Sequence, residues 1–414
     1  MNPRAFVPFF VGRVLSTLGR QMLAVAVGWD LYERTSSFLV LGLVGAAQVL
    51  PVILLAVPSG HAVDRFDARR MGALASALIG VTGVALAAAT YEGAPVPAIL
   101  ALLAVHGAGV GLLAPSASSV LPRIVALEER ARANAVMSTG FELASIGGPG
   151  LAGGLLALTK SAPLVFLIHA ALSLAFGVIL AVLRARGIGA PERAGAPASA
   201  SSSWSSMAAG VRFVFSSRLL LPAMTLDLFA VLFGGVTALL PAFARDVLHA
   251  GPEGLGALRA APAVGALAMA LISTRLPPWK RPGRALFVAI GFFAASTLAF
   301  ALSDVLWLSI VCLGISGAAD NVSVVIRMTL EQMVTPDDMR GRVSAVRYVF
   351  IGMSNELGEL ESGLAAALLG LVPSVVVGVT VSLVVVVVVL ARWPDLGRLG
   401  PLAALRPDKL RTDG

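Results

Sequence analysis

Several ionisable side chains stand inside long apolar stretches of the sequence, where they could carry chemistry. In chain order the main ones are Arg13, Arg20, Asp227, Asp320 and Glu359. A charge at the centre of a membrane-spanning helix costs about 2.5–3.5 kcal/mol on insertion scales, so such residues usually have a partner or a function. Burial can also bring an acid into the physiological titration range. These residues therefore predict either buried ion pairs or a site that binds and releases protons.

Depth along the expected helices indicates which of these charges could meet. At about 1.5 Å per residue, Arg13 and Asp227 both fall about 12 Å from the inner end of their helices. Arg20 lies level with Glu356 and Glu359 in the outer half. The depths permit an Arg13–Asp227 pair, and a pair between Arg20 and Glu359 or Glu356. A static salt bridge that fixes helix packing remains the alternative for each pair.

Asp320 and Glu359 are the acids that we predict to bind protons in a central cavity. Asp320 falls near the middle of the membrane, and Glu359 lies level with Arg20 in the outer half. The further candidates for proton coupling are Glu142, Asp227 and Glu356, and those for the cavity wall are Arg13, Arg20, Asn321 and Asn355. Nearer the inner end, Arg327 and Glu331 are four residues apart and are expected to form an ion pair along one helix.

The sequence offers no motif for a cofactor, a metal or catalysis. It lacks the Gly-Lys-Ser/Thr element of a phosphate-binding loop, so we do not expect the chain to hydrolyse ATP. The single cysteine, Cys312, excludes a disulfide framework and a thiolate metal site. The histidines are expected to be structural because they lie in separate segments, at His61, His106, His169 and His249. We expect a protein that is not an enzyme and holds neither cofactor nor metal.

The elements that must position these charges are membrane-spanning helices. Of 414 residues, 57% are apolar and only 13% are charged, and the mean hydropathy is +0.88. Such a chain has too little polar surface to cover a water-soluble globule. The net charge of +8 would suggest nucleic-acid binding in a soluble protein. Here it is expected to reflect basic loops on the cytoplasmic face.

Twelve apolar runs are long enough to span a membrane. They cover residues 5–31, 39–62, 71–91, 97–121, 134–158, 162–183, 219–243, 254–275, 285–303, 305–330, 343–370 and 372–391. The first run is not a cleaved signal peptide, because Arg13 and Arg20 interrupt it. We expect an N-terminal six-helix bundle (1–184), a linker with a short amphipathic helix on the membrane surface (185–218), a C-terminal six-helix bundle (219–393) and a tail (394–414).

The distribution of Lys and Arg predicts the orientation of these spans. With the N-terminus in the cytoplasm, 24 of the 31 Lys and Arg residues lie in cytoplasmic segments and three lie outside. The opposite orientation would invert this bias, against the positive-inside rule. We therefore expect both termini in the cytoplasm.

The two halves of the chain repeat in sequence. A loop in which acids precede arginines leads into the fifth run at residues 128–136 and into the eleventh at 337–346. Residues 148–153, Gly-Pro-Gly-Leu-Ala-Gly, align with residues 358–363 at an offset of 210. The pair Leu-Gly opens the second run at residues 41–42 and the eighth at 255–256. Two six-span repeats of one orientation are typical of transporters with a binding site between their halves.

Several motifs resemble those of the major facilitator superfamily. The loop from Gly60 to Arg70, Gly-His-Ala-Val-Asp-Arg-Phe-Asp-Ala-Arg-Arg, resembles the signature G-x-x-x-D-R-x-x-R-[KR], with one extra residue before the final basic pair. Residues 148–153 resemble the antiporter motif G-P-x-x-G-G, with Ala152 in place of its first late glycine. Three further segments are similar to a branch of bacterial exporters of drugs and siderophores: residues 13–33, 335–344 and 355–363.

The resemblance implies an all-α integral membrane fold of twelve helices in two six-helix repeats. It also implies a gate at the signature loop, formed by Gly60, Asp64, Arg65, Arg69 and Arg70. Gly60 would let helices approach, and Asp64 would bond to backbone amides where the eleventh span begins, near Gly341. An ordinary basic loop is the alternative interpretation. The antiporter-like motif would bend the fifth span through Gly148, Pro149 and Gly153.

We therefore expect a secondary active transporter that exports a small amphipathic compound, siderophore-like or drug-like, against inward proton flow by alternating access. An importer or facilitator is the alternative within this class. A membrane protein for signalling or scaffolding is the alternative from another class, which the buried acids disfavour. The expected partners are the lipid bilayer, protons and a small-molecule substrate, without nucleic acid. The chain is expected to be a monomer in a bacterial cytoplasmic (inner) membrane, with multiple spans.

Overall fold

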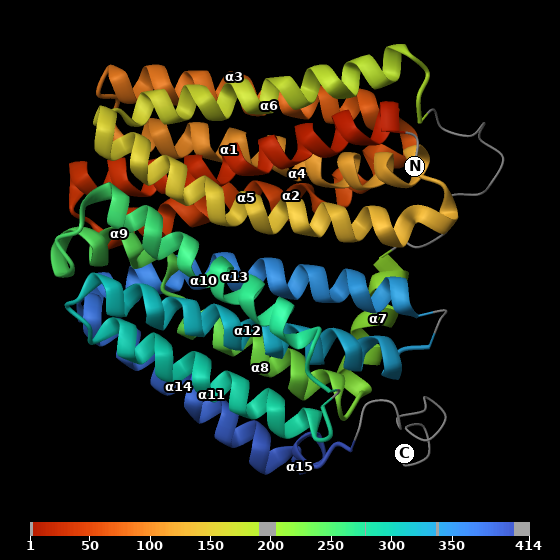
Figure 1. The fold of residues 1–414 in the computed structure, drawn as a ribbon, viewed down its shortest axis with the longest axis vertical. Helices are drawn as coiled ribbons and strands as arrows, with labels where there is room; N and C mark the ends of the chain where they lie inside the picture. Colours follow the sequence, from red (N-terminus) through yellow and green to blue (C-terminus); the bar gives the residue numbers. More distant parts are fainter. Residues whose placement is uncertain (1–2, 190–203, 278, 337–338, 401–414) are drawn as a thin grey trace. The chain divides into compact units, whose positions relative to one another are not determined.

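The protein is all-helical throughout the part of the chain that its structure describes. The computed structural model describes residues 3–189, 204–277, 279–336 and 339–400, and no strand occurs within these ranges. The helices that correspond to the twelve apolar runs are α1 (Pro3–Thr35), α2 (Phe38–Arg65), α3 (Ala68–Tyr91), α4 (Val96–Ile124), α5 (Arg130–Thr159), α6 (Ala162–Ala185), α8 (Leu220–Gly234), α10 (Gly251–Ser273), α11 (Pro282–Ala301), α12 (Leu306–Val334), α13 (Arg340–Leu369) and α14 (Leu371–Arg392) (Figure 1). The predicted all-α fold of twelve helices is confirmed.

Most of these helices are long and apolar enough to cross a membrane. Eleven segments within the described residues meet that description, and α13 adds a twelfth helix of 30 residues. Polar side chains cap the N-terminal ends of three of these helices. Ser37 and Ser161 accept hydrogen bonds from the first turns of α2 and α6, and Asp67 does so at α3. The left-handed backbone of Lys160 ends α5. Eleven of the twelve predicted runs therefore correspond to single helices, with edges that differ by a few residues.

The seventh predicted span is not one continuous helix. The run from 219 to 243 reads as a single span, but α8 ends at Gly234 and Gly235 is extended. Short helical turns follow: η2 (Thr237–Leu239), α9 (Leu240–Ala242) and η3 (Phe243–Val247). The Ser362 hydroxyl of α13 donates to the Gly235 carbonyl at 3.0 Å, so the break has a partner for its exposed backbone.

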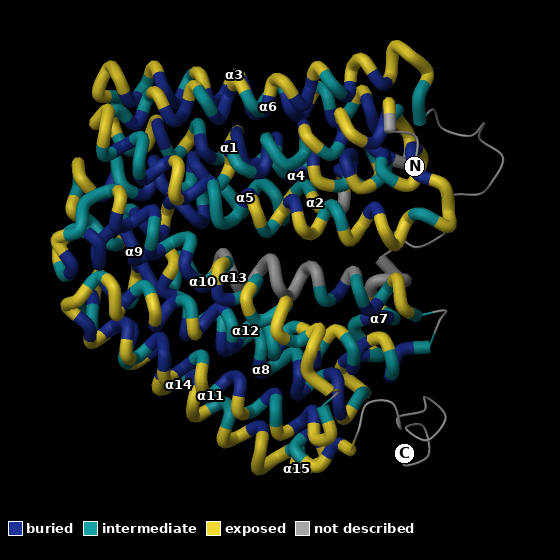
Figure 2. Tube along the Cα trace, viewed as in Figure 1, coloured by how far each residue is buried: buried dark blue, intermediate teal, exposed yellow. Residues whose placement is uncertain are grey.

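The chain forms two compact units. The first comprises Met1–Ser199 with Pro241–Ala260, and the second comprises Ala200–Leu240 with Ala261–Gly414. The predicted division into bundles and linker follows the order of the sequence and stays a prediction. In each unit, buried positions alternate with exposed ones along the helices, as Figure 2 shows. Many exposed positions are large and apolar, which suits helices that face lipid.

The same packing pattern appears in both units. In the first, α1 packs against α5 and α6, and α3 packs against α4 and α6. In the second, α8 packs against α13 and α14, and α11 packs against α12 and α14. If the twelve membrane-spanning helices are numbered in chain order, each of these contacts in the second unit joins helices numbered six higher than those of a contact in the first unit. The packing within each unit therefore agrees with the sequence repeat.

Two glycines at equivalent positions make this packing close. A Cβ on Gly148 of α5 would lie 2.9 Å from the Leu18 carbonyl of α1. A Cβ on Gly358 of α13 would lie 3.1 Å from the Val231 carbonyl of α8. Both helices thus need a residue without a side chain where they meet the first helix of their repeat. The 210-residue offset seen in the sequence is an offset between equivalent helix contacts.

Residues 241–260 belong to the first unit through polar contacts with α1. The Tyr32 hydroxyl donates to the Asp246 carboxylate. The Arg245 guanidinium donates to the Tyr32 carbonyl and to the Ser36 hydroxyl, both at 3.0 Å, and it lies 5.2 Å from the centre of the Tyr32 ring. These four contacts therefore hold residues 241–260 against the end of α1.

A close contact between two glycines fastens the same segment to α5. A Cβ on Gly256 of α10 would lie 2.6 Å from the Pro149 carbonyl. A Cβ on Gly153 would likewise lie 2.6 Å from the Pro252 carbonyl. The antiporter-like motif therefore serves helix packing at both ends, with Gly148 toward α1 and Gly153 toward α10.

The linker helix forms as predicted but is not only a surface helix. It is α7 (Trp204–Ser216), and it packs against α13. Val214 is fully buried, and a Cβ on Gly210 would lie 2.9 Å from the Arg342 carbonyl. The side of α7 that carries Gly210 and Val214 therefore covers protein. Phe215, on the face that the sequence assigned to the membrane surface, is exposed, and that assignment stays a prediction.

Candidate functional site

The signature loop lies between α2 and α3. Asp64 is in the last turn of α2, and its side chain is outside the described part of the structure, so the predicted latch stays a prediction. Arg65 and Arg70 are exposed. A Cβ on Gly60 would meet nothing within 4 Å among the described residues, and the predicted part of this glycine in the gate stays a prediction.

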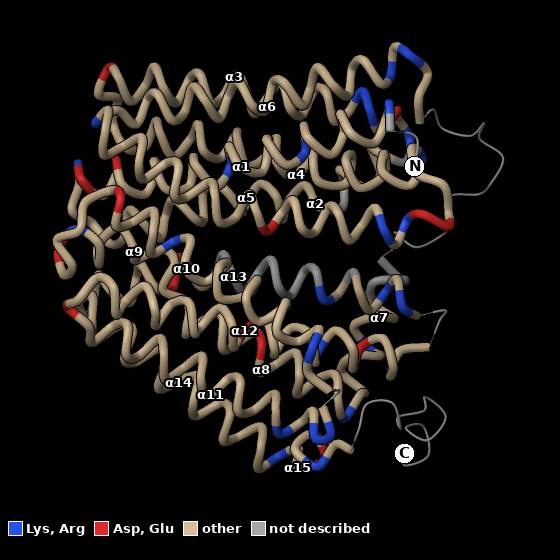
Figure 3. The backbone as a smooth tube through the Cα atoms, viewed as in Figure 1, with Lys and Arg blue, Asp and Glu red and all other residues tan. Residues whose placement is uncertain are grey.

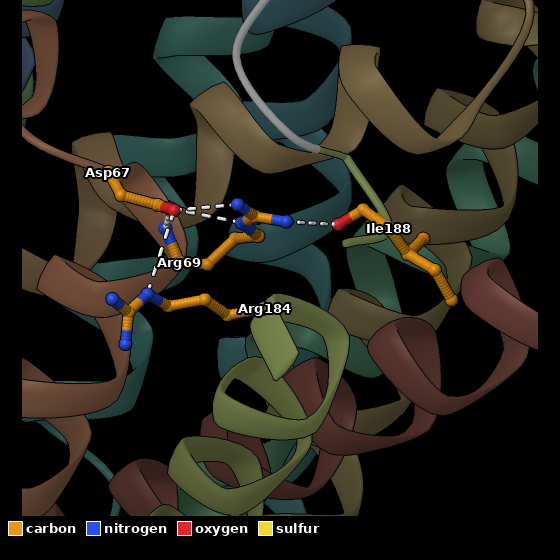
Figure 4. Close-up of polar contacts among 4 residues, drawn as sticks. All are labelled: Asp67, Arg69, Arg184 and Ile188. Atoms are coloured by element: carbon orange, nitrogen blue, oxygen red, sulfur yellow. Dashed lines mark hydrogen bonds and ion pairs between the residues drawn. The ribbon is translucent and has the colours of Figure 1, made fainter. Parts of the chain in front are cut away.

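Arg69 is buried in a polar cluster rather than exposed at a gate. Its guanidinium bonds to both carboxylate oxygens of Asp67, at 3.0 Å and 2.6 Å, and donates to the Ile188 carbonyl at 2.7 Å (Figure 4). Arg184 adds a contact of 3.7 Å to Asp67. The Arg69 hydrogen bonds lower the pKa of Asp67 to about 2. Arg69 thus anchors the loop to the end of α6, and its partner is Asp67, which lies between the Asp-Arg pair and the final basic pair of the signature.

The charged candidates of the first unit are spread along α1 and α5. Arg13 is half-buried and Arg20 is exposed, both on α1, while Glu142 is half-buried on α5. A hydrogen bond of 3.1 Å from Gln21 to Ser145 joins these two helices. The described geometry of this unit does not test the roles predicted for these three residues, which stay predictions.

Three charges of the second unit meet where α8 and α12 lie together. Arg327 binds the Asp227 carboxylate through one guanidinium nitrogen, and a second nitrogen lies 3.8 Å from Asp320. The side chains of Arg327 and Asp227 are 13% and 15% exposed, whereas that of Asp320 is 48% exposed. Figure 3 shows acidic and basic residues side by side at this contact. One arginine therefore serves a buried and a half-exposed acid.

These contacts correct two expectations about pairing. Depth along the helices allowed Arg13 as the partner of Asp227, but the partner is Arg327. Spacing along α12 favoured an Arg327–Glu331 pair, but Glu331 instead contacts Arg347 of α13 at 3.4 Å and accepts a hydrogen bond of 2.9 Å from Ser344. Tertiary contacts with α8 and α13 compete with the i,i+4 pair, because both offer a buried charge a better partner.

A cavity of about 200 Å³ joins the two ion pairs. Its polar lining is Asp227, Arg327, Glu331 and Arg347, and its apolar lining is Leu220, Ala223, Met224, Val324 and Met328. A second cavity of about 10 Å³, room for about one water, lies beside Asp227, Asp320 and Ser323. The site thus combines apolar walls, two flexible methionines and fixed charges, which is the lining of a pocket for an amphipathic molecule.

Polar atoms near Asp320 lack partners within the described structure. The Ser323 hydroxyl and the Asn321 side-chain oxygen are both buried, and neither has a hydrogen-bond partner among the described residues. Leaving a buried polar atom unsatisfied is costly, so such atoms usually bond to water or to a ligand. Asn321, a predicted cavity residue, therefore follows Asp320 in the chain and has a buried side-chain oxygen that could accept a hydrogen bond from water or a ligand.

The acid of α13 that we predicted to bind protons is half-buried. Glu359 lies one residue after Gly358, at the contact with α8. The side chains of Asn355 and Glu356 are outside the described residues, so their predicted places in the cavity stay predictions.

Two histidines that the sequence placed in separate segments meet in the first unit. The Nε2 atoms of His106 on α4 and His169 on α6 are 3.0 Å apart, and both side chains are buried. At that distance one ring donates and the other accepts, so the two tautomers are coupled. Their similar depth along α4 and α6 was the signal in the sequence. In the described chain no group of three or more His, Cys, Asp or Glu side chains could hold a metal ion.

Among the described residues, this cluster holds more carboxylates than guanidiniums. Asp227, Asp320 and Glu331 supply three carboxylates to the two guanidiniums of Arg327 and Arg347. The carboxylate of Asp320 is the most exposed and the farthest from its arginine. It is therefore the group that can take a proton or a cationic ligand without breaking the closest ion pairs.

Comparison with known proteins identifies the family. A sequence model of the Major Facilitator Superfamily matches residues 9–359. The multidrug efflux pump Tap of Mycobacterium tuberculosis is 30% identical over 285 residues, which cover 66% of each chain and so just under two thirds of Tap. The enterobactin exporter EntS of Shigella boydii is 28% identical over 352 residues, or 83% of this chain and 80% of EntS.

Solved structures agree on the fold. A bacterial homologue of the human lysosomal transporter Spinster, inward-facing and occupied, superimposes with a TM-score of 0.74 at 14% identity, covering 96% of this chain and 98% of that one. A bacterial homologue of the iron transporter ferroportin, inward-facing, gives a TM-score of 0.70 at 16% identity, covering 96% and 100%. At these identities the likeness concerns the fold alone. With the family match over most of its length, the chain belongs to the major facilitator superfamily.

Proposed function

We propose that this transporter exports a small amphipathic compound in exchange for protons, with Asp320 as the principal coupling acid. The observation that carries the proposal is the unequal sharing of Arg327 between buried Asp227 and half-exposed Asp320. The similarity to an efflux pump and to an exporter supports the direction of transport. An importer or a facilitator remains the alternative, and the test below separates it from export.

The sharing of Arg327 gives a simple route for coupling. With Asp320 ionised, the cluster carries one uncompensated negative charge, which attracts a proton or a positively charged group of the substrate. When Asp320 is protonated, the cluster loses that negative charge and Arg327 pairs with Asp227 alone. A proton and a substrate therefore compete for the same carboxylate, and alternating access turns the competition into exchange. An uncompensated carboxylate favours a drug-like compound with a cationic group over an anionic one.

Other acids are secondary candidates for proton transfer. Glu359, Glu356 and Glu142 are further candidates for proton transfer, and Asp227 is the fixed partner of Arg327. Glu359 is half-buried beside the contact of α13 with α8, where a change in helix packing would alter its surroundings. The signature loop, through Asp64 with Arg65 and Arg70, supplies the gate.

We place the protein in a bacterial cytoplasmic membrane, as a monomer with both termini in the cytoplasm. The excess of Lys and Arg in one set of loops supports this orientation. Labels near Lys160 or His249 should react from outside the cell, and a reporter fused after Arg398 should be active only in the cytoplasm. Protection of both labelled positions would reverse the orientation.

The test of the function uses purified full-length protein in liposomes with an imposed proton gradient. Uptake of cationic drugs, neutral drugs and siderophores into these liposomes should reveal a substrate whose accumulation depends on the gradient and is accompanied by proton movement. Asp320→Asn should abolish uphill accumulation and spare downhill exchange. Asp304→Asn, the same change at an exposed acid beyond the end of α11, is the matched control and should behave as wild type.

Two results would overturn the proposal. Gradient-dependent accumulation that Asp320→Asn leaves intact would place the coupling acid elsewhere. Transport that runs only downhill in the wild type would instead support a facilitator.

A further inference from the structure

Six exposed basic side chains gather at one end of the second unit. They lie in the loop between α10 and α11, at the start of α11, at the end of α14 and just after the short helix α15 (Pro394–Gly397). Figure 3 shows Lys and Arg residues collected around α15. We call them the basic patch: Arg275, Lys280, Arg281, Arg284, Arg392 and Arg398.

Close backbone contacts hold the elements of the basic patch together. The Leu396 carbonyl of α15 occupies the space that a Cβ on Gly283 of α11 would need. A Cβ on Gly397 would lie 3.4 Å from Leu390 of α14 and 3.6 Å from Phe287 of α11. Leu396 is fully buried in the core of this unit. The short helix α15 is therefore fixed between α11 and α14, and the charges are presented from a packed surface.

The basic patch is not neutralised by the protein around it. Asp395 is the one acid in the described stretches 274–284 and 392–400, and it is exposed. Within the described residues, none of the six cations forms an ion pair. The corresponding region of the first unit differs, since Arg69 and Arg184 there share Asp67. Like charges held close together without counter-ions repel, so an external anion would stabilise the arrangement.

Aromatic and apolar side chains place the patch at the edge of a lipid-facing surface. Trp279 and Trp393 are half-buried and pack on the core next to it, and the Arg392 guanidinium lies 5.8 Å from the centre of the Trp393 ring. Tryptophans of this kind mark the boundary between the apolar membrane interior and the headgroups. Exposed apolar side chains continue from there along α11 and α14, including Val288 and Val387.

We propose that the basic patch binds the headgroups of anionic phospholipids, such as phosphatidylglycerol, on the face of the membrane that we propose to be cytoplasmic. Arginine guanidiniums offer forked donors that match phosphate oxygens, and basic residues near an anionic membrane surface contribute about 1 kcal/mol each. The adjoining apolar flank of α11 and α14 accommodates the acyl chains. A free phosphate ion has no acyl chain, so it would use only part of this surface. The site is independent of substrate and proton coupling.

The experiment compares lipid binding to full-length protein in a neutral detergent. Retained phosphatidylglycerol and phosphatidylcholine are counted by native mass spectrometry for the wild type and for Arg281→Gln/Arg284→Gln. The matched control, Arg123→Gln/Arg132→Gln, removes the same charge from exposed positions of the first unit beside Glu128 and Glu129. Because each basic residue is worth about fivefold in affinity, the patch variant should bind phosphatidylglycerol on the order of twentyfold more weakly. The control should bind like the wild type, and phosphatidylcholine binding should not change.

Further arms make the result decisive. Arg281→Lys/Arg284→Lys keeps the positive charge and should keep most of the phosphatidylglycerol binding. This expectation holds whether or not the glutamine variant folds. Equal loss in the control would show that only total charge matters, and unchanged binding in the patch variant would exclude the site. Inorganic phosphate should not displace phosphatidylglycerol at equal concentration. Displacement would show a simple anion site and would overturn the assignment to lipid.

Discussion

Arg327 on α12 binds the carboxylate of Asp227 on α8, so a buried ion pair crosses the contact between these two helices. The favourable charge interaction of such a pair is largely offset by the loss of hydration of both groups. Removing one partner, however, leaves the other charge buried alone. The pair is therefore a weak source of net stability and a strong constraint on which residues can be changed singly.

Arg327→Gln should lower the free energy of unfolding by about 3 kcal/mol, because Asp227 would be left without its guanidinium. The double variant Arg327→Gln/Asp227→Asn should recover most of that loss, since two neutral amides can bond to each other. Thermal unfolding of the purified proteins in one detergent measures both. A double variant as unstable as the single one would show that Arg327 acts through other contacts.

Asp64→Asn should slow transport at least tenfold while the folded protein remains as stable as the wild type. The change is nearly isosteric and lies in the last turn of α2, but it removes the charge that we expect to bond to backbone amides. Initial rates in liposomes and thermal unfolding together provide the measurement. Full transport rates in this variant would leave the signature loop without a gating role.

Gly153→Ala should destabilise the first unit by about 1–3 kcal/mol, because the new methyl group would lie 2.6 Å from the Pro252 carbonyl. Gly154→Ala is the matched control. A Cβ on Gly154 meets nothing within 4 Å, so this change should be neutral or stabilise α5 by up to about 1 kcal/mol. Thermal unfolding of both variants tests the contact, and equal stabilities would show that α5 and α10 are not in close contact.

Asp67→Asn should reduce stability by about 1 kcal/mol near neutral pH, after allowance for solvent screening. The folded-state pKa of Asp67 is lowered to about 2, below that of an unfolded aspartate, so its contribution is present above about pH 4. As the pH falls toward about 2, the wild type takes up the proton and the difference from the variant should disappear. Unfolding temperatures measured across this range provide the check, and a difference that grows on acidification would contradict the sign.

Hydrophobic length and Gly-Pro punctuation were sufficient to predict twelve helices and their repeat. The alignment of Gly148 with Gly358 even anticipated equivalent helix contacts, because close packing demands the smallest residue at both sites. The break at Gly234 was missed, since the run from 219 to 243 has the length and the predominantly apolar composition of a single span. A pair of adjacent glycines was the local signal, and Ser362 of a distant helix makes the break tolerable.

Two acids of the site were predictable from the sequence, but Arg347 and the pairing of the charges were not. Asp227 and Asp320 stood out as charges in apolar runs, yet nothing in the sequence shows that Arg327 faces both. Helical spacing instead favoured Glu331, and the contact with Arg347 depends on how α12 meets α13. Depth along a helix is readable from sequence, whereas rotation about its axis is set by neighbours. The meeting of His106 and His169 was missed for the same reason.

The placement of residues 241–260 in the first unit has a consequence for biosynthesis. The sixth helix of that unit ends at Ala185, but its last packed segment ends at Ala260. At about 5–20 residues per second, a ribosome needs roughly 4–15 s to cover the interval. During that time the residues that Tyr32 and Gly153 contact in the finished protein have not yet been synthesised. The nascent first half must therefore remain incomplete in the membrane until the eighth span has begun to emerge.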